Sequence, residues 1–307
     1  MSDLVSDPVV VTGANGLVGS RVCAALLERG APVRAVVRRP GAAPDLAGVE
    51  EVVGDFADPE FAARVVVGAA GVVTTVHPMG SDLATQHAVA VVGTPVLARA
   101  ARDAGVARFV HLSTAAVYDR SPSAGEVDEA AALVDDDADD YAVTKRDTDT
   151  GLGAVEGSTT VLLRPPAILG SGDTSVWNTL RPRAMSTDAA ERRAVPDATW
   201  AWVHVDDLAA LAALVAVGAV RSSDDAGRGP VEGACTALNV AAPRATQRDY
   251  VGTVCDALGV EPEWTDEPAW RGSIQTDRAR AWGWSPKVDL EQALAELHQG
   301  LHQGPRR

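Results

Sequence analysis

Short, unbroken apolar runs alternate with longer amphipathic stretches through the first two-thirds of the chain. The apolar runs lie at residues 9–12, 33–37, 51–53, 72–76, 109–113 and 160–163. Because their apolar residues are consecutive rather than alternating, we expect strands buried on both faces of a parallel sheet. Helical patterns fill the gaps at about 58–67, 85–104 and 138–152, and a first helix ends at Gly30. The pattern predicts an α/β protein with a Rossmann-type, doubly wound parallel sheet.

The pattern loosens after Arg164-Pro165-Pro166. Residues 170–201 have no clear period, a strand and a helix return at 202–218, and the remainder is mixed. We therefore expect a dinucleotide-binding domain over residues 1–165, to which 202–220 returns. Residues 166–201 and 221–307 are predicted to form a small, discontinuous C-terminal lobe that binds substrate.

Charge and composition narrow the function classes. The 307 residues carry a net charge of −15, which disfavours binding to nucleic acid or to an anionic membrane. The longest apolar stretch, 208–220, is too short to span a bilayer. Three cysteines without metal-ligand spacing, and a start unlike a signal peptide, predict a cytoplasmic protein without a metal. The preference for arginine over lysine suggests a bacterial source.

A glycine-rich segment follows the first predicted strand directly. Residues 12–19 read Thr-Gly-Ala-Asn-Gly-Leu-Val-Gly, with glycines spaced G-x-x-G-x-x-G. Glycine permits a tight turn and a close approach of the backbone to a pyrophosphate, whose charge meets the amino end of the next helix. The segment predicts dinucleotide binding through Gly13, Asn15, Gly16, Leu17 and Gly19.

The end of the second strand discriminates between the two nicotinamide nucleotides. It carries Arg38 and Arg39, where an acidic residue would bind the ribose 2′-hydroxyl of NAD. Guanidinium groups suit a 2′-phosphate, so we expect NADP(H) in preference to NAD(H). The alternative is a pair of solvated arginines at a strand end. Asp55, after the third strand, is expected to meet the adenine amine.

One lysine stands out in a chain with only two lysines and 25 arginines. Lys145 follows Tyr141, one of three tyrosines, by one helical turn. A retained lysine suggests a site that needs a compact ammonium rather than a planar guanidinium. The alternative is a surface lysine that happens to lie one turn from a tyrosine.

Together these motifs resemble the extended short-chain dehydrogenase/reductase superfamily, which includes nucleotide-sugar epimerases and dihydroflavonol-type reductases. The matching segments are the glycine turn, Gly54-Asp55, residues 110–118, residues 141–145, Leu163-Arg164-Pro165 and residues 202–207. The resemblance implies that Tyr141 is the general acid or base, that Lys145 holds the nicotinamide ribose, and that Thr114, or its neighbour Ser113, binds the substrate oxygen. Phe56, Val76 and Pro165 complete the expected cofactor contacts.

The proposed role of Tyr141 has a physical requirement. A free tyrosine has a pKa of about 10, and work near neutrality calls for a shift of about three units. An ammonium at about 4 Å, such as that of Lys145, would supply most of this shift. We therefore expect Lys145 to lower the pKa of Tyr141.

Several residues depart from the motifs of the superfamily, and these departures limit the reactions that we expect. Ala115 and Ala116 occupy positions where sugar dehydratases carry an Asp-Glu pair, so dehydration is disfavoured. Trp200-Ala201-Trp202 stands where epimerases commonly have an arginine for the substrate diphosphate, which suggests a flat or apolar substrate. We expect His77, Trp177 and Trp202 to contact substrate, although each could instead be structural.

The sequence thus predicts an NADPH-dependent reductase that transfers a hydride to a ketone or aldehyde of a small metabolite. A nucleotide-sugar 4-epimerase or 4-ketoreductase is the alternative, and a non-catalytic NADP sensor is disfavoured because such relatives typically lose the Tyr-Lys pair. The resemblance also favours a homodimer packed through the helices near 85–104 and 138–152.

Overall fold

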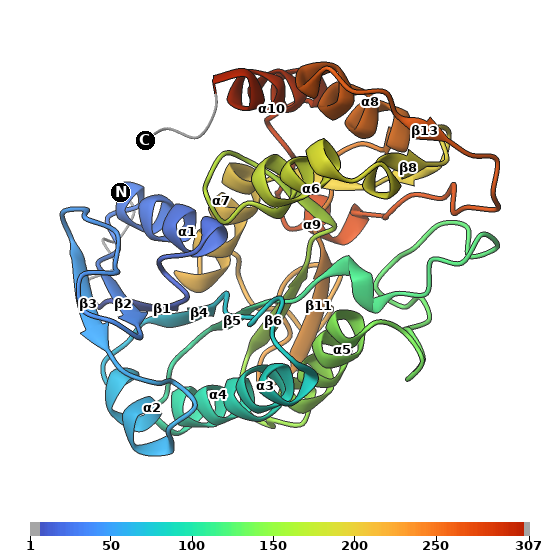
Figure 1. Ribbon diagram of the computed structural model, residues 1–307. Helices are drawn as coiled ribbons and strands as arrows, with labels where there is room; N and C mark the ends of the chain where they lie inside the picture. Colours follow the sequence, from blue (N-terminus) through green and yellow to red (C-terminus); the bar gives the residue numbers. More distant parts are fainter. Residues whose placement is uncertain (1–6, 304–307) are drawn as a thin grey trace.

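A seven-stranded parallel sheet forms the centre of the protein, as the computed structural model of residues 7–303 shows (Figure 1). Its strands lie in the order β11-β6-β5-β4-β1-β2-β3. They are β1 (Val9–Thr12), β2 (Val33–Val37), β3 (Val49–Val53), β4 (Gly71–Thr74), β5 (Phe109–Leu112), β6 (Thr160–Arg164) and β11 (Cys235–Asn239). The chain order reverses between β1 and β4, and a crevice at the carboxyl ends of the strands is expected at such a reversal. The predicted doubly wound sheet is confirmed.

Helices cover both faces of this sheet. On one face lie α1 (Leu17–Glu28) and α7 (Val205–Ala216); on the other lie α2 (Pro59–Val65), α4 (Thr94–Asp103) and α5 (Asp140–Gly153) (Figure 1). The short α3 (Leu83–Gln86) runs through a π-helical segment, His87–Gly93, directly into α4. Successive valines of β1 point to opposite faces: Val9 and Val11 join the core under α1 and α7, and Val10 joins the core under α2 and α4. This two-sided burial explains the unbroken apolar runs.

A smaller lobe with its own apolar core packs over the carboxyl ends of the strands. Its strands are β7 (Ala167–Leu169), β8 (Arg193–Ala194), β9 (Thr199–Trp200), β10 (Trp202–His204), β12 (Ala245–Thr246) and β13 (Glu263–Trp264). Its helical segments are the π-helix Val176–Leu180, α6 (Arg181–Thr187), the 3-10 turn Ala190–Arg192, α8 (Gln247–Leu258) and α10 (Leu290–Gln303). Met185, Trp202, Tyr250 and Leu297 meet in its core.

The structure corrects one predicted boundary. Residues 221–307 were expected in the small lobe, but β11 pairs with β6 and extends the main sheet. Trp282 and Trp284, which follow α9 (Asp277–Ala281), also pack into the core beneath α1 and α7. The reason is that β6 is wholly buried, so its outer backbone groups need a hydrogen-bonding partner, which this distant segment supplies.

Two absences apply to residues 7–303. No helix within them is both long and apolar enough to cross a membrane. Nor do three His, Cys, Asp or Glu side chains within them gather closely enough to hold a metal ion. All three cysteines are free thiols.

Candidate active site

A cavity of about 1130 Å³ opens between the carboxyl ends of the strands and the small lobe. It brings together nearly all of the residues predicted for the cofactor and the chemistry. Those that line it are Gly13, Asn15, Gly16, Leu17, Arg38, Arg39, Phe56, Val76, His77, Ser113, Thr114, Tyr141, Lys145, Pro165 and Trp177. The predicted residues outside this lining are Gly19, Asp55 and Trp202.

The glycine turn between β1 and α1 borders the cavity at the amino end of α1. Gly13 has a φ of +71°, and a Cβ placed on it would lie 2.6 Å from the hydroxyl oxygen of Thr75. The amide of Gly16 donates to the Gly13 carbonyl at 2.9 Å, which closes the turn. Gly19 was predicted as a cofactor contact, but its position serves packing: a Cβ there would lie 2.1 Å from the Gly13 carbonyl oxygen. The turn therefore leaves room for a pyrophosphate at the amino end of α1.

The ends of β2 and β3 border the cavity on the side where the sequence predicts the adenosine. Arg38 and Arg39 follow β2, are exposed to solvent and border the cavity. Phe56 also borders it, and is buried. Asp55 instead points its carboxylate at the Ala57 amide, from which it accepts a hydrogen bond at 2.9 Å. The predicted contact of Asp55 with an adenine amine stays a prediction.

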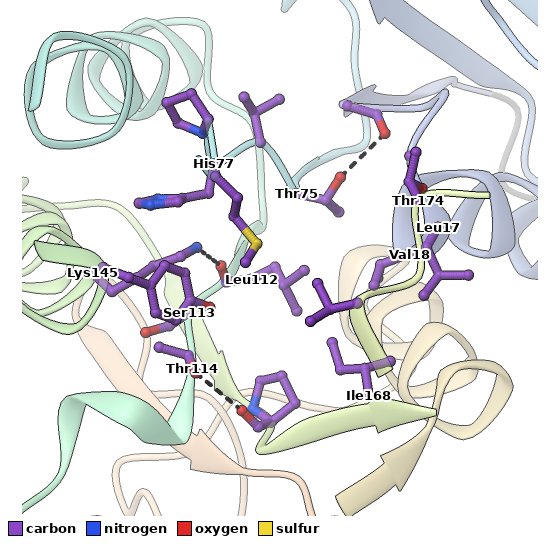
Figure 2. A pocket seen from close by; sticks show the side chains of 18 of the residues that line it. Leu17, Val18, Thr75, His77, Leu112, Ser113, Thr114, Lys145, Ile168 and Thr174 are labelled. Atoms are coloured by element: carbon purple, nitrogen blue, oxygen red, sulfur yellow. Dashed lines mark hydrogen bonds between the residues drawn. The ribbon is translucent and has the colours of Figure 1, made fainter. Parts of the chain in front are cut away.

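Tyr141 and Lys145 lie in the first turns of α5. The helix is capped by Asp139, whose carboxylate accepts from the Ala142 amide at 3.0 Å. Lys145 is buried, and its ammonium donates to the Leu112 carbonyl oxygen at 2.6 Å, as Figure 2 shows. Burial lowers the pKa of Lys145 to about 8, against the partly compensating charge of Asp149. Near neutrality the side chain is therefore largely charged and close to its titration point.

The Lys145 shift has a consequence for stability. Because its pKa is lower in the folded protein than in the unfolded chain, the protonated lysine opposes folding fully below pH 8, and the cost disappears as the pH rises from 8 to 10.5. We expect Lys145→Met to stabilise the fold by about 1–3 kcal/mol near neutrality. Urea unfolding of both proteins at about pH 7 and pH 10 measures this gain. A difference that does not shrink at the higher pH would contradict the prediction.

The pKa of Tyr141 is shifted in the direction opposite to the one expected. Burial raises it, helped by the carboxylates of Asp139 and Asp149, while a hydrogen bond with Thr114 opposes the shift. The sequence-based expectation considered the ammonium of Lys145 but not the loss of solvent around the phenol. Tyr141 is thus a protonated phenol near neutrality, which is the form that can donate a proton.

The two hydroxyl residues after β5 have different partners. Ser113 donates to a carboxylate oxygen of Asp149 at 2.8 Å, and the same oxygen accepts from Arg164 at 3.0 Å. Thr114 accepts from the Ala116 amide at 3.1 Å and makes a longer bond of 3.4 Å to the Pro165 carbonyl (Figure 2). The hydroxyl of Ser113 is already hydrogen-bonded to the Asp149 carboxylate, so Thr114 is the better placed of the two to bind a substrate oxygen.

His77 lies edge-on to the Tyr141 ring, with centroids 4.9 Å apart and planes at 88°. Its Nε2 is 3.0 Å from the Gln86 amide oxygen. Burial and the charge of Lys145 lower the pKa of His77 to about 4. The imidazole is therefore neutral near pH 7 and packs beside the phenol as a neutral wall of the cavity.

Tryptophans form the wall that the small lobe contributes. Trp177 borders the cavity as predicted, but Trp202 does not: it is fully buried and donates its indole N–H to the Pro243 carbonyl at 3.0 Å. Trp200 borders the cavity instead. The chain changes sheets at Ala201, since Trp200 pairs with β12 and Trp202 pairs with β7, so the two indoles enter different surroundings.

Several lining residues were missed from the sequence, namely Thr75, Met79, Arg120, Thr174 and Gln247. Arg120 lies two residues after Tyr118, the last residue of a matched motif, and this proximity is a signal that could have identified it. Thr174 and Gln247 belong to segments without sequence motifs, and only the packing of the small lobe brings them to the cavity.

The fold and the cavity lining define a Rossmann-type α/β protein with a nucleotide site at the carboxyl ends of its strands. A profile of the NAD dependent epimerase/dehydratase family matches residues 9–225. The chain belongs to this family, which confirms the resemblance drawn from the motifs.

Two relatives match about half of the chain. The chain is 31% identical over 182 residues to a 2-alkyl-3-oxoalkanoate reductase of Stenotrophomonas maltophilia, an alignment that covers 57% of this chain and 55% of that protein. It is 33% identical over 184 residues to a 3 beta-hydroxysteroid dehydrogenase/Delta 5-->4-isomerase of Mycobacterium tuberculosis, covering 56% of this chain and 50% of that protein. The chain thus spans about half the length of these relatives.

A solved structure supports the fold over nearly the whole chain. The Bordetella bronchiseptica enzyme WbmH, in complex with NAD+, superposes with a TM-score of 0.73 at 23% identity, covering 94% of this chain and 96% of that one. This similarity supports the assignment of the fold.

Proposed function

We propose that the protein is an NADPH-dependent reductase that transfers a hydride to a keto or aldehyde group of a small metabolite. The observation that carries the proposal is the convergence of Tyr141, Lys145 and Thr114 in the cavity that also contains the glycine turn. The names of the two relatives support it, because one is a reductase of a 3-oxo compound and the other a dehydrogenase of a hydroxysteroid.

The residues of the cavity have separable roles in this reaction. When bound, the reduced nicotinamide supplies the hydride. The hydroxyls of Thr114 and Tyr141 hold the carbonyl oxygen and polarise it, and Tyr141 donates its phenolic proton as negative charge develops there. Lys145 holds the ribose and stabilises the phenolate that remains, until solvent returns the proton. The raised pKa of Tyr141 favours this acid role.

A panel of ketones and aldehydes, monitored by loss of reduced-nicotinamide absorbance, tests the proposal. The sequence-based alternative, a nucleotide-sugar 4-epimerase or 4-ketoreductase, belongs to the same family. An epimerase keeps its nucleotide bound and causes no net oxidation of NADPH. Purified protein that retains a tightly bound nucleotide and oxidises no NADPH with any carbonyl compound would therefore favour the epimerase.

We further propose that NADP(H) is preferred over NAD(H). Arg38 and Arg39 both border the cavity beyond β2, and no Asp or Glu among residues 7–303 borders it beside them. Two guanidiniums can form charge-assisted hydrogen bonds to a 2′-phosphate.

Removing these guanidiniums tests the preference. We expect Arg38→Ser/Arg39→Ser to weaken NADPH binding by about 10–100-fold, the loss appropriate to charge-assisted hydrogen bonds, and to leave NADH binding within about threefold. Titration of protein fluorescence with each nucleotide measures both. Arg29→Ser, which changes an exposed arginine at the end of α1, is the matched control. Equal losses for NADPH and NADH would contradict the proposed preference.

We also propose a cytoplasmic homodimer that packs through α4 and α5. Leu83 and Val92, on the helical segments that lead into α4, are among the exposed large apolar side chains. Light scattering during size-exclusion chromatography measures the molar mass, and we expect twice the mass of one chain.

A further inference from the structure

The cavity and the rest of the chain differ in charge. The whole chain carries 42 acidic residues and a net charge of −15. Among residues 7–303, however, the side chains lining the cavity include no Asp or Glu and four that carry a cationic group, Arg38, Arg39, Arg120 and Lys145. Such a lining favours an anionic ligand in an acidic protein that otherwise repels anions. The proposed nucleotide accounts for Arg38, Arg39 and Lys145, which leaves Arg120.

Arg120 lies on the substrate side of the cavity, near the proposed general acid. It follows the segment after β5 that also supplies Thr114 and Ala116 to the lining. The carboxylate of Asp139 acts electrostatically on both Arg120 and Tyr141, so the two side chains lie near the same end of α5. A substrate whose carbonyl oxygen meets Tyr141 can therefore place a neighbouring group against Arg120.

The guanidinium of Arg120 has little to bind within the protein. It lies over the Trp270 ring, 5.8 Å from the ring centroid, and no side-chain hydrogen bond or ion pair engages it in residues 7–303. Arg164 and Arg146, by contrast, both hydrogen-bond to carboxylates. Burial also lowers the pKa of Arg120, opposed by the charge of Asp139. A partly buried guanidinium without acceptors is one that a ligand oxygen would stabilise.

We propose that Arg120 binds a carboxylate that the substrate carries beside its reducible carbonyl, so that the substrate is a keto acid. This inference rests on the proposed reductase function and specifies its substrate class. One guanidinium matches one carboxylate in charge and in its paired hydrogen bonds. The Trp177 and Trp200 wall then receives the apolar part of the molecule.

Matched acids and esters test the inference. We expect the wild-type protein to reduce at least one of 2-oxo-, 3-oxo- and 4-oxooctanoate with a kcat/KM about tenfold or more above that of its methyl ester. Arg120→Gln should remove this preference mainly through a rise in KM for the acid, while the ester changes by less than about threefold. Arg120→Lys should recover part of the preference, because it keeps the charge but loses the paired geometry.

Two controls separate this inference from the reductase proposal. Arg29→Gln, an exposed arginine at the end of α1, should leave both substrates unaffected. Quenching of tryptophan fluorescence by each octanoate in the presence of NADP+ reports binding without turnover, because the oxidised nucleotide has no hydride to transfer. Equal use of acids and esters by the wild type, or reduction of neutral ketones only, overturns the inference and leaves the reductase proposal intact. Arg120-dependent binding of the acids without reduction supports the inference and counts against the reductase.

Discussion

Tyr141→Phe is expected to lower kcat by about a thousandfold, within the range of positioned proton donors, and to leave NADPH affinity within about threefold. The phenol is protonated near neutrality and borders the cavity beside Thr114, so its loss removes the proton that a developing alkoxide requires. The ring itself remains, which preserves the packing against His77. Single-turnover reduction and fluorescence titration measure the two quantities separately.

Tyr250→Phe is the matched control for this change. Tyr250 is buried in the small lobe, and its hydroxyl donates to the Trp177 carbonyl at 2.7 Å, outside the cavity lining. Its loss should cost about 1 kcal/mol of stability and change kcat by less than about tenfold. If Tyr141→Phe retained activity within tenfold of the wild type, Tyr141 would not be the general acid.

Arg164→Met is expected to destabilise the protein by about 3–5 kcal/mol, the range found when one partner of a buried ion pair is removed. Arg164 and Asp149 pair at 3.0 Å with side chains only 7% and 4% exposed, and Arg164 also donates to the Tyr118 hydroxyl at 2.9 Å. The substitution leaves the Asp149 carboxylate buried with Ser113 as its remaining hydrogen-bond donor. Urea unfolding followed by tryptophan fluorescence measures the loss.

The chain offers an exposed counterpart for this pair. Arg228 and Asp225 lie 3.6 Å apart with side chains 81% and 60% exposed. Arg228→Met should therefore change stability by no more than about 0.5 kcal/mol. Combining Arg164→Met with Asp149→Leu should recover part of the loss, since the buried carboxylate that Arg164→Met leaves without its ion-pair partner is then removed. A loss below about 1 kcal/mol for Arg164→Met alone would show that the pair contributes little to the fold.

Local signals in the sequence predicted the elements well. The strand predicted at 33–37 agrees with the structure at both ends, and α8 (Gln247–Leu258) has clear sequence signals at both of its ends. The helix is bounded by local chemistry: Thr246 and Asp249 form a capping box, and Gly259 ends the helix in the left-handed conformation. The glycine turn and the Tyr-Lys pair were also recognisable, because each depends on residues close together in the chain.

Features that depend on distant segments were predicted poorly. The addition of β11 to the sheet follows from the unpaired edge of β6, about 70 residues earlier in the chain. The sequence could not tell which of Trp200 and Trp202 borders the cavity, because the answer depends on the change of sheet between them. The pKa of Tyr141 was predicted in the wrong direction because the burial of its phenol in the folded protein has no local signature in the sequence. Arg120 was missed because it lies just beyond the end of the matched motif, which closes at Tyr118.

The stoichiometry of NADPH oxidised to alcohol formed, measured with purified protein and the carbonyl panel, tests the reductase proposal most directly. We predict one alcohol for each NADPH oxidised by the wild-type protein, and alcohol formation about a thousandfold slower with Tyr141→Phe. The reductase proposal would be contradicted if no ketone or aldehyde oxidised NADPH while the protein interconverted nucleotide sugars and the amount of bound nucleotide stayed constant.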